Sequence, residues 1–522
     1  MVVRESLNIR KLVEEAERVG AVFSRYYYGV EEIPITLEKG KILPYGAYVF
    51  VKDLDGLPII YQLAKPVWFR ASEDFEEGLI AAGEKVESGG MERYRCTGVL
   101  FGKVREDGEI TLPKYPVPPF SDVYSCPEEL VRFITEPLTD WKIRIGVDAV
   151  TEAPVYLALE PLLRQSLLLT GAQGTGKTTA MLTLIARAAM KGVHFLILDW
   201  TGEYGALKDG DYGDKECEPL KDYVKVIPWW VFVFSLLRDR IEELYDVVAH
   251  ERELSRAVKD LLLDAFEYCA EKRLFPSREN LLKAIDAVRD RRYETTVKGA
   301  KRAIMKSKYL LNNEKLVIET KEIRELLEDI ITFRVIVVDF TASKEGLPDE
   351  FEFKRKVAEY IVEAVWEAAT GSLKGNFGCV IVSDEAHRIC PEPRVLGGTG
   401  PSKIWITLAT EGGRNCVPFW LVARRLSLVA KSITVESQQN FFCFNVEDVD
   451  RRRVAEEVGE TFASLLGTLP AGEAVVKSMG FRKPGSVAHV KFDVVVRPSS
   501  AKLRAKDVFR NMVNRNLKVL KT

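Results

Sequence analysis

The chain lacks the features of a secreted, zinc-stabilised or membrane-spanning protein. Its 8 cysteines are scattered and form no C-x-x-C pair, which argues against a zinc site and indicates an intracellular protein with mostly buried thiols. Its first residues lack the apolar segment of a signal peptide. Its most apolar run, residues 227–237, contains a proline and is far shorter than the roughly 20 residues that a bilayer span needs. We therefore expect a cytoplasmic protein and interpret this run as a core strand or a subunit contact.

A surplus of charge of one sign is also missing. The 75 Lys and Arg nearly balance the 77 Asp and Glu, so that the formal net charge is −2. Because no general basic field exists, any contact with nucleic acid has to be local, for instance inside a channel. At 522 residues the chain is too long for one simple core, and several domains are expected.

The chain does contain a phosphate-binding loop. Residues 171–179 read G-A-Q-G-T-G-K-T-T and match the pattern G-x-x-x-x-G-K-[ST], between an apolar run and a helical pattern. Backbone N–H groups and the helix N-terminus would bind phosphate there, with Lys177 on the β- and γ-phosphates and Thr178 on Mg²⁺. We predict that the nucleotide is bound by Gly171, Gln173, Gly174, Thr175, Gly176, Lys177, Thr178 and Thr179.

A second motif supplies carboxylates. The apolar run from Cys379 ends in Asp384-Glu385, which predicts a strand with a carboxylate pair at its carboxyl end. Asp384 would join Thr178 in holding Mg²⁺, and Glu385 would polarise the attacking water. His387 is interpreted as a structural or coupling residue. These residues predict an ATPase that uses ATP and Mg²⁺.

A third cluster follows another apolar run and reads Asp199-Trp-Thr-Gly-Glu203-Tyr204. Such strand ends are where open α/β sheets bind ligands. A functional role for Asp199 and Glu203, and a plain polar turn with a packed tryptophan and tyrosine, both stay open.

The texture of the chain changes along its length. Residues 1–20 have apolar residues at helical spacing, and from about residue 20 to 120 short β-rich pieces predict a small barrel or sandwich. From about residue 140 apolar strands alternate with helices, which predicts a parallel sheet covered on both faces. Between Phe234 and about residue 329 helix follows helix, which predicts an insertion between two strands.

Several of these motifs together resemble one family. Lys177, the signature Asp199…Gly202-Glu203-Tyr204 and the box Asp384-Glu385-Ala-His387 follow a β-rich module, as in the HerA-type DNA-translocating ATPases of archaea, which are grouped with FtsK-like and conjugation-type motors. The proline-rich strap at 116–119 and the stretch L-P-A-G-E-A at 469–474 are similar to the family's as well. The resemblance covers most of the chain.

The resemblance implies an α/β fold with a RecA-like P-loop ATPase core, an N-terminal β-barrel of the HAS-barrel type and a helical insertion. It also implies ATP-driven movement along double-stranded DNA by a homo-hexameric ring, in DNA end processing beside a NurA-like nuclease. The expected domains are the barrel (1–135), the first part of the motor (136–233), the helical insertion (234–330), the second part of the motor (331–496) and a basic C-terminal helix (497–522).

The resemblance departs at two arginine positions. Where the family reads R-E-G-R after the acidic box, this chain has Thr410 and Gly413 in the arginine slots and Arg414 one position later. Arg414 is our candidate for the arginine that reaches a neighbouring subunit's nucleotide. The family's sensor glutamine is replaced by Arg424, which suits phosphate oxygens and equally indicates a divergent paralogue. Arg164 lies near a further arginine position without being clearly in register. The predicted catalytic residues are Lys177, Glu385, Arg414 and Arg424.

Contacts with nucleic acid are expected in two segments. The glycine-rich loop 391–403 is interpreted as a pore loop or a plain surface loop. The basic stretch 497–522 has an apolar stripe that favours a ring neighbour over DNA or a membrane surface.

Three functions stay open at this point. The first is the DNA translocase, and the second is a membrane-associated DNA import or conjugation-type ATPase similar to CedB. The third is a nucleotide-binding subunit without turnover. A DEAH-box RNA helicase is disfavoured, because the chain has neither that family's arginine motif nor a second RecA-like half.

Overall fold

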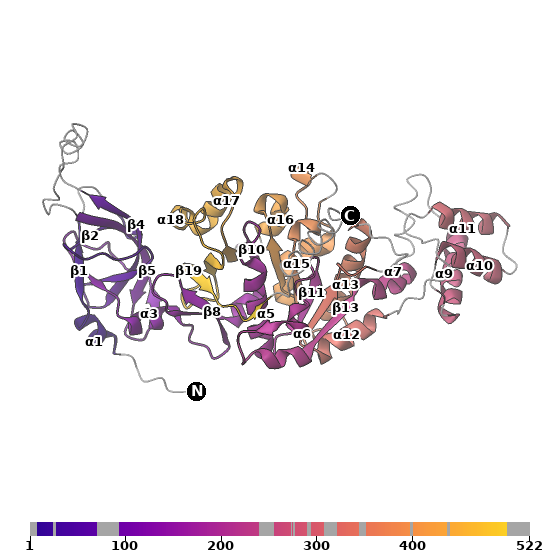
Figure 1. Ribbon diagram of the computed structural model, residues 1–522, viewed down its shortest axis with the longest axis horizontal. Coiled ribbons are helices and arrows are strands. Elements are labelled where there is room, and N and C mark those ends of the chain that lie inside the picture. Colours follow the sequence, from indigo (N-terminus) through magenta and orange to yellow (C-terminus); the bar gives the residue numbers. More distant parts are fainter. Residues whose placement is uncertain are drawn as a thin grey trace, which may run out of the picture. The chain divides into compact units, whose positions relative to one another are not determined.

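The computed structural model describes residues 8–23, 28–69, 93–239, 255–272, 274, 277–289, 294–306, 321–343, 351–396, 400–435 and 439–497 (Figure 1). Over these residues the chain divides into two units. The first comprises Met1–Leu162, Leu169–Ala180 and Gln438–Asp493, and the second Leu163–Leu168, Met181–Ser437 and Val494–Thr522. Among the described residues, no helix has the length and apolar character needed to span a membrane.

The N-terminal part of the first unit is a closed β-barrel, drawn in indigo and violet in Figure 1. Its strands alternate in burial, as in β2, where Ile33, Ile35 and Leu37 lie in the core. β2 pairs with β1 on one side and β5 on the other, which closes the sheet and protects the strand edges. The strand order is β2-β1-β7-β3-β4-β5-β6. The bounds are β1 (Arg18–Val22), β2 (Glu32–Leu37), β3 (Tyr48–Lys52), β4 (Pro58–Phe69), β5 (Arg93–Val104), β6 (Ile110–Thr111) and β7 (Asp122–Ser125).

The N-terminal helix is shorter than the sequence indicates. Apolar spacing over residues 1–20 predicts one helix, but α1 (Ile9–Glu14) ends early and Val19 lies inside β1. Ile9 and Val13 are buried together in one core cluster, whereas Val19 belongs to the other, inside the barrel. The prediction was wrong beyond Glu14 because a strand that begins at Arg18 continues the same apolar spacing.

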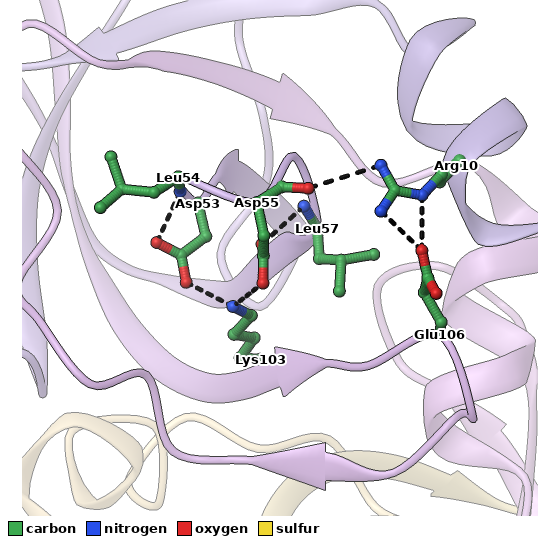
Figure 2. A network of polar contacts seen from close by, with 7 residues as sticks. All are labelled: Arg10, Asp53, Leu54, Asp55, Leu57, Lys103 and Glu106. Carbon is green, nitrogen blue, oxygen red and sulfur yellow. Dashed lines mark hydrogen bonds and ion pairs between the residues drawn. The ribbon is translucent and has the colours of Figure 1, made fainter.

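A polar network joins α1 to the barrel (Figure 2). Lys103 in β5 lies between two carboxylates, with its Nζ 2.6 Å from Asp53 Oδ2 and a second ion pair to Asp55. Arg10 of α1 donates to Glu106 Oε1 at 2.6 Å and to the Asp55 carbonyl oxygen at 3.5 Å. Helix α1, the turn at Asp53–Asp55 and strand β5 are therefore held by one set of charges.

The remainder of the first unit is an antiparallel sheet with the order β17-β18-β19-β8-β9. The turn between β18 and β19 contacts the barrel, where Arg482 Nη2 donates to the Gly108 carbonyl oxygen at 2.8 Å and Lys483 donates to that of Phe101. The bounds are β8 (Lys142–Asp148), β9 (Pro154–Ala158), β17 (Asn440–Cys443), β18 (Glu473–Ser478), β19 (Ser486–Phe492), α3 (Glu128–Thr135), α17 (Asp448–Val458) and α18 (Glu460–Ala463).

The second unit contains a parallel sheet in the order β13-β14-β11-β15-β16. Its strands are almost continuously buried, as the apolar runs predict for a sheet covered on both faces. The bounds are β11 (Phe195–Asp199), β13 (Val224–Pro228), β14 (Val335–Asp339), β15 (Val380–Ser383) and β16 (Phe419–Ala423), with α6 (Ala206–Asp209), α12 (Ile323–Thr332), α13 (Phe351–Thr370), α14 (Pro393–Leu396), α15 (Lys403–Glu411) and α16 (Lys431–Thr434).

Three elements carry the chain between the units, namely α4 (Leu159–Arg164), β10 (Leu167–Thr170) and α5 (Lys177–Met190). The described end of the chain forms β20 (Val496–Arg497), which pairs antiparallel with β12 (Asp211–Tyr212) in the second unit. Arg497 is thus in a strand, and the basic helix predicted for the residues after it lies outside the described residues.

Helices fill the chain between β13 and β14, as the sequence predicts. Two of them cross closely, since a Cβ on Gly299 of α11 would lie 3.1 Å from Val258 Cγ2 of α9. The bounds are α7 (Val233–Asp239), α9 (Arg256–Glu271), α10 (Arg278–Val288) and α11 (Glu294–Lys306). The predicted α/β class with an N-terminal barrel and a helical insertion is confirmed.

The aromatic run at 227–237 is only partly a strand. β13 ends at Pro228, a 3-10 turn spans Trp229–Phe232, and α7 follows. Trp229 and Phe232 are fully buried, and the Trp229 indole N–H donates to the Ala342 carbonyl oxygen at 3.0 Å. These aromatic side chains belong to the core of the second unit and are unavailable to a membrane surface.

Candidate nucleotide-binding site

The phosphate loop owes its shape to glycines. Gly171, Gly174 and Gly176 have φ angles of 152°, 78° and 105°, which side chains rarely tolerate. A Cβ on Gly171 would lie 2.7 Å from Phe444 Cβ, and one on Gly176 would lie 3.0 Å from Gly472 Cα. Two of these glycines therefore let the loop pass close against the chain around β17 and β18.

The loop presents its tip to solvent. Gln173 and Gly174 are exposed, whereas the side chains of Thr175, Thr178 and Thr179 are partly buried. α5 begins at Lys177, so the N–H groups of its first turn face the end of the loop. Unpaired N–H groups at a helix N-terminus bind anions, and this arrangement suits the phosphates of a nucleotide.

Lys177 reaches back across the loop. Its Nζ donates to the Ala172 carbonyl oxygen at 2.6 Å, and the Thr175 hydroxyl donates to the same oxygen at 2.8 Å. A phosphate oxygen would offer the ammonium group a stronger, charge-assisted hydrogen bond than this neutral carbonyl does.

Residues that sequence reasoning overlooked hold the loop in place. The Ala172 N–H donates to the Asn445 carbonyl oxygen at 2.7 Å, and the Gly472 N–H donates to that of Thr175 at 2.9 Å. Asn445 Nδ2 in turn donates to the Leu469 carbonyl oxygen at 3.2 Å. The stretch L-P-A-G-E-A thus supports the phosphate loop from the side. The available signal for Asn445 was its position directly after the apolar run 441–444.

The second unit supplies an acidic edge. β11 and β14 pair in register, so that Asp199 lies opposite Asp339 at their carboxyl ends, and Asp384 follows the last residue of β15. Sequence reasoning singled out Asp199 and Asp384 and missed Asp339, although the run ending in Asp339 has the same pattern. The parallel arrangement brings all three carboxylates to one edge of the sheet.

Asp384 is held by the loop after β11. Its Oδ1 accepts from the Trp200 backbone N–H at 2.8 Å, and its Oδ2 accepts from the Thr201 hydroxyl at 2.5 Å. Burial raises the pKa of Asp384 well above its usual range, and the charge of Asp199 adds to this effect. A cation would relieve that cost.

Asp199 organises its own loop. Its Oδ1 accepts from the N–H groups of Thr201 and Gly202, at 3.1 and 2.7 Å, and its Oδ2 accepts from that of Tyr204 at 3.0 Å. Burial nevertheless raises the pKa of Asp199 to about 6, against the lowering effect of these hydrogen bonds. The signature is therefore a turn wrapped around a buried carboxylate, next to Asp384.

Glu385 has an unusual backbone. Its φ of 47° and ψ of 49° lie in the left-handed region, which is sparsely populated by residues other than glycine and is found at functional sites. Its Oε2 lies 3.1 Å from His387 Nδ1, and both side chains are about a quarter exposed, 27% and 25%. A water molecule can therefore reach the Glu385 carboxylate, as a general base requires.

The donors suit Mg²⁺ shared with a nucleotide. No group of three or more His, Cys, Asp and Glu among the described residues could hold a metal by itself. Mg²⁺ is typically bound by one or two carboxylates together with phosphates and water. The Asp384 carboxylate and the Thr178 hydroxyl are hard oxygen donors of the kind that such a site uses.

The two candidate arginines lie at opposite ends of β16, and both are exposed. Arg424 follows the last residue of the strand, on the edge where Asp384 follows β15. Arg414 belongs to a 3-10 turn, Gly412–Asn415, that precedes the strand. Since a strand rises about 3.3 Å per residue, roughly 15 Å of strand separates the two ends.

Together, the phosphate loop between β10 and α5, the acidic edge and the parallel sheet define a P-loop ATPase with a RecA-like core. More particularly, residues 143–349 match the family model for the central domain of the helicase HerA, and the predicted HerA-type resemblance is confirmed.

Two relatives from Methanocaldococcus jannaschii extend the similarity. A probable DNA double-strand break repair helicase HerA is 23% identical over 511 residues, which cover 88% of this chain and 93% of the relative. A probable helicase, MJ1565, is 22% identical over 416 residues, which cover 76% of each chain. Among solved structures, the bacterial conjugative coupling protein TrwB gives a TM-score of 0.42 at 13% identity, covering 67% of this chain and 88% of its own. VirB4 of Thermoanaerobacter pseudethanolicus gives 0.40 at 15% identity, covering 68% of this chain and 97% of its own.

Proposed function

We propose that the chain is a Mg²⁺-dependent ATPase that moves along double-stranded DNA as a homo-hexameric ring. The observation that carries the proposal is a complete set of P-loop ATPase groups, Lys177, Asp384 and Glu385, in a chain with a HerA central domain. The printed descriptions of the two relatives as helicases support a role on nucleic acid.

The residues divide the chemistry among them. The loop N–H groups and Lys177 bind the phosphates, while Thr178 and Asp384 hold Mg²⁺, which neutralises phosphate charge. Glu385 Oε accepts the proton of the attacking water. The left-handed backbone at Glu385 supports this role, because it costs folding energy that a merely structural residue would not retain.

The arginines would serve two different sites. Arg424 lies on the same edge of its sheet as Asp384, which suits contact with the γ-phosphate of its own subunit. Arg414 lies at the opposite edge, so it suits a neighbour's nucleotide across a ring interface. A ring in which each site is completed by the next subunit would follow from this arrangement.

Contact with DNA is proposed for the segment 391–403 after the acidic box. Arg394 in α14 is exposed, as is Lys403 at the start of α15. Cations on a channel lining bind phosphates without reading sequence. A NurA-like nuclease beside the ring would make the activity part of DNA end processing.

The alternative is a membrane-associated import ATPase similar to CedB. Its sequence support was Arg424 and the aromatic run 229–234, and the burial of Trp229 and Phe232 removes the second of these. Co-purification separates the readings, because a nuclease partner favours end processing and a membrane-channel partner favours transport.

The test is steady-state ATP hydrolysis with and without duplex DNA. We expect turnover that duplex DNA stimulates, and a loss of at least about hundredfold in Lys177→Ala and in Glu385→Gln. Glu385→Gln should still bind nucleotide, because the amide keeps the size of the side chain. Unchanged hydrolysis in Glu385→Gln would contradict the assigned base, and absent turnover in the wild type would favour a nucleotide-binding subunit without catalysis. Particle images with duplex DNA would count the subunits in the ring.

A further inference from the structure

The Tyr204 hydroxyl is a buried polar group without a hydrogen-bond partner. Tyr204 is fully buried, and among the described residues its hydroxyl has no partner. Its backbone N–H donates to Asp199 Oδ2 at 3.0 Å, so the residue is fixed on the acidic edge. A buried hydroxyl without a partner destabilises a fold, because it loses its hydrogen bonds to water on burial.

Carboxylates surround this hydroxyl. Burial raises the pKa of Tyr204 well above its ordinary value, and the charges of Asp384, Asp199, Glu203 and Glu385 raise it further. The phenol therefore stays protonated at any physiological pH and can act as a hydrogen-bond donor. A neutral donor among negative groups is suited to a carboxylate acceptor.

The four carboxylates differ in how far they are already committed. Asp199 accepts hydrogen bonds from three backbone N–H groups of its own loop. Asp384 accepts two hydrogen bonds and is the proposed ligand of Mg²⁺. Glu203 lies beside Tyr204 in the chain and has no role in the proposed reaction. Glu385 is the carboxylate whose direction decides whether a water is activated, and its present neighbour is His387, 3.1 Å away.

We propose that the Tyr204 hydroxyl donates a hydrogen bond to the Glu385 carboxylate in the hydrolysing state, and so positions the general base. This inference rests on the proposed ATPase function and deepens it. Glu385 then has two partners, His387 in the structure described here and Tyr204 when Mg²⁺ and ATP are bound. Tyr204 is a positioning residue, because it acts on the reaction through Glu385.

The chain offers a matched control in the barrel. Tyr61 in β4 is also fully buried, and its hydroxyl also lacks a partner among the described residues. Replacing either tyrosine with phenylalanine removes one oxygen from a buried site and keeps the ring. Both variants should therefore unfold at the wild-type temperature or slightly above it.

The experiment compares wild type, Tyr204→Phe and Tyr61→Phe in the full-length protein. We expect kcat in Tyr204→Phe to fall by about ten- to hundredfold, the range for one hydrogen bond to a charged group, with the KM for ATP changed by less than about threefold. Tyr61→Phe should keep the wild-type kcat. In a Glu385→Gln background, Tyr204→Phe should lower the residual rate much less than it does in the wild type, since the two residues act together.

Two measurements without turnover complete the test. The unfolding temperature of nucleotide-free Tyr204→Phe should match that of Tyr61→Phe, and a clear loss would overturn the proposal by revealing a structural partner. The Mg²⁺ concentration that half-saturates nucleotide binding should stay at the wild-type value, and a shift would overturn it by assigning the hydroxyl to Asp384. Wild-type kcat in Tyr204→Phe would overturn it as well. If the wild type itself has no turnover, the proposed function fails, and the inference fails with it.

Discussion

The backbone of Arg164 occupies the space that a side chain at Gly413 would need. A Cβ built on Gly413 would lie 2.0 Å from the Arg164 carbonyl oxygen and 2.9 Å from the Gln165 backbone nitrogen. A Cβ on the preceding Gly412 would lie 2.4 Å from the Val417 carbonyl oxygen. An arginine therefore cannot stand at position 413 while this turn keeps its shape, and Arg414 is the next position available.

Gly413→Ala should destabilise the protein by at least about 3 kcal/mol, because a buried methyl group meets backbone atoms that have no alternative rotamer. Gly205→Ala is the control. A Cβ there meets nothing within 4 Å and the φ of −54° suits alanine, so the change should stay within about 1 kcal/mol of wild type. Chemical denaturation of both variants measures the difference, and equal stability would contradict the close approach.

Lys103→Met should destabilise the barrel by about 1–3 kcal/mol. Its side chain is 15% exposed and lies between Asp53 and Asp55, so methionine would leave two carboxylates facing each other without a cation. Lys41→Met removes a solvent-exposed ion pair with Glu17, and such pairs contribute about 1 kcal/mol or less. Thermal unfolding ranks the two variants, and an equal loss would show that the network in Figure 2 adds nothing beyond a surface pair.

The strands of the motor could be predicted to within about a residue because buried parallel strands are continuous apolar runs. The predicted run 194–199 corresponds to β11, and the run 334–340 to β14. The loop at 171–179 was equally readable, since its glycines serve local backbone angles that the pattern encodes. These features depend on neighbours in the sequence, and they are visible there.

What could not be predicted depends on contacts between distant residues. Nothing local marks Asn445 as a support for the phosphate loop, or Gly413 as the neighbour of Arg164. The left-handed backbone of Glu385 is likewise invisible, because glutamate has no local preference for it. Residues 1–20 failed for a different reason, since one apolar spacing served a helix and then a strand.

Asp199 should make folding less favourable as the pH rises. Its folded pKa of about 6 lies above its ordinary value, so its contribution is fully favourable below about pH 4 and is lost as the pH passes about 6. The difference corresponds to about 3 kcal/mol. In Mg²⁺-free denaturation, Asp199→Asn should therefore gain stability relative to wild type between about pH 4 and pH 7.

Asp329 provides a control of opposite sign. Hydrogen bonds from Lys225 and Lys321 hold the pKa of its carboxyl below the ordinary value despite some burial, so the wild type gains stability from it as the pH rises. Asp329→Asn should lose stability relative to wild type over the same range. Two difference curves with the same slope would contradict the assignment of Asp199 as a carboxylate destabilised by burial.

Mixing variants tests whether Arg414 acts on a neighbouring subunit. Lys177→Ala and Arg414→Ala should each lower ATP turnover by about 10²- to 10³-fold. In mixed rings, an Arg414→Ala subunit keeps its phosphate loop and can receive Arg414 from a Lys177→Ala neighbour, so some sites become complete and turnover returns. Arg424→Ala mixed with Lys177→Ala should stay inactive, because Arg424 and Lys177 are proposed to serve the same subunit's nucleotide. Recovery in the second mixture and not in the first would exchange the roles of the two arginines.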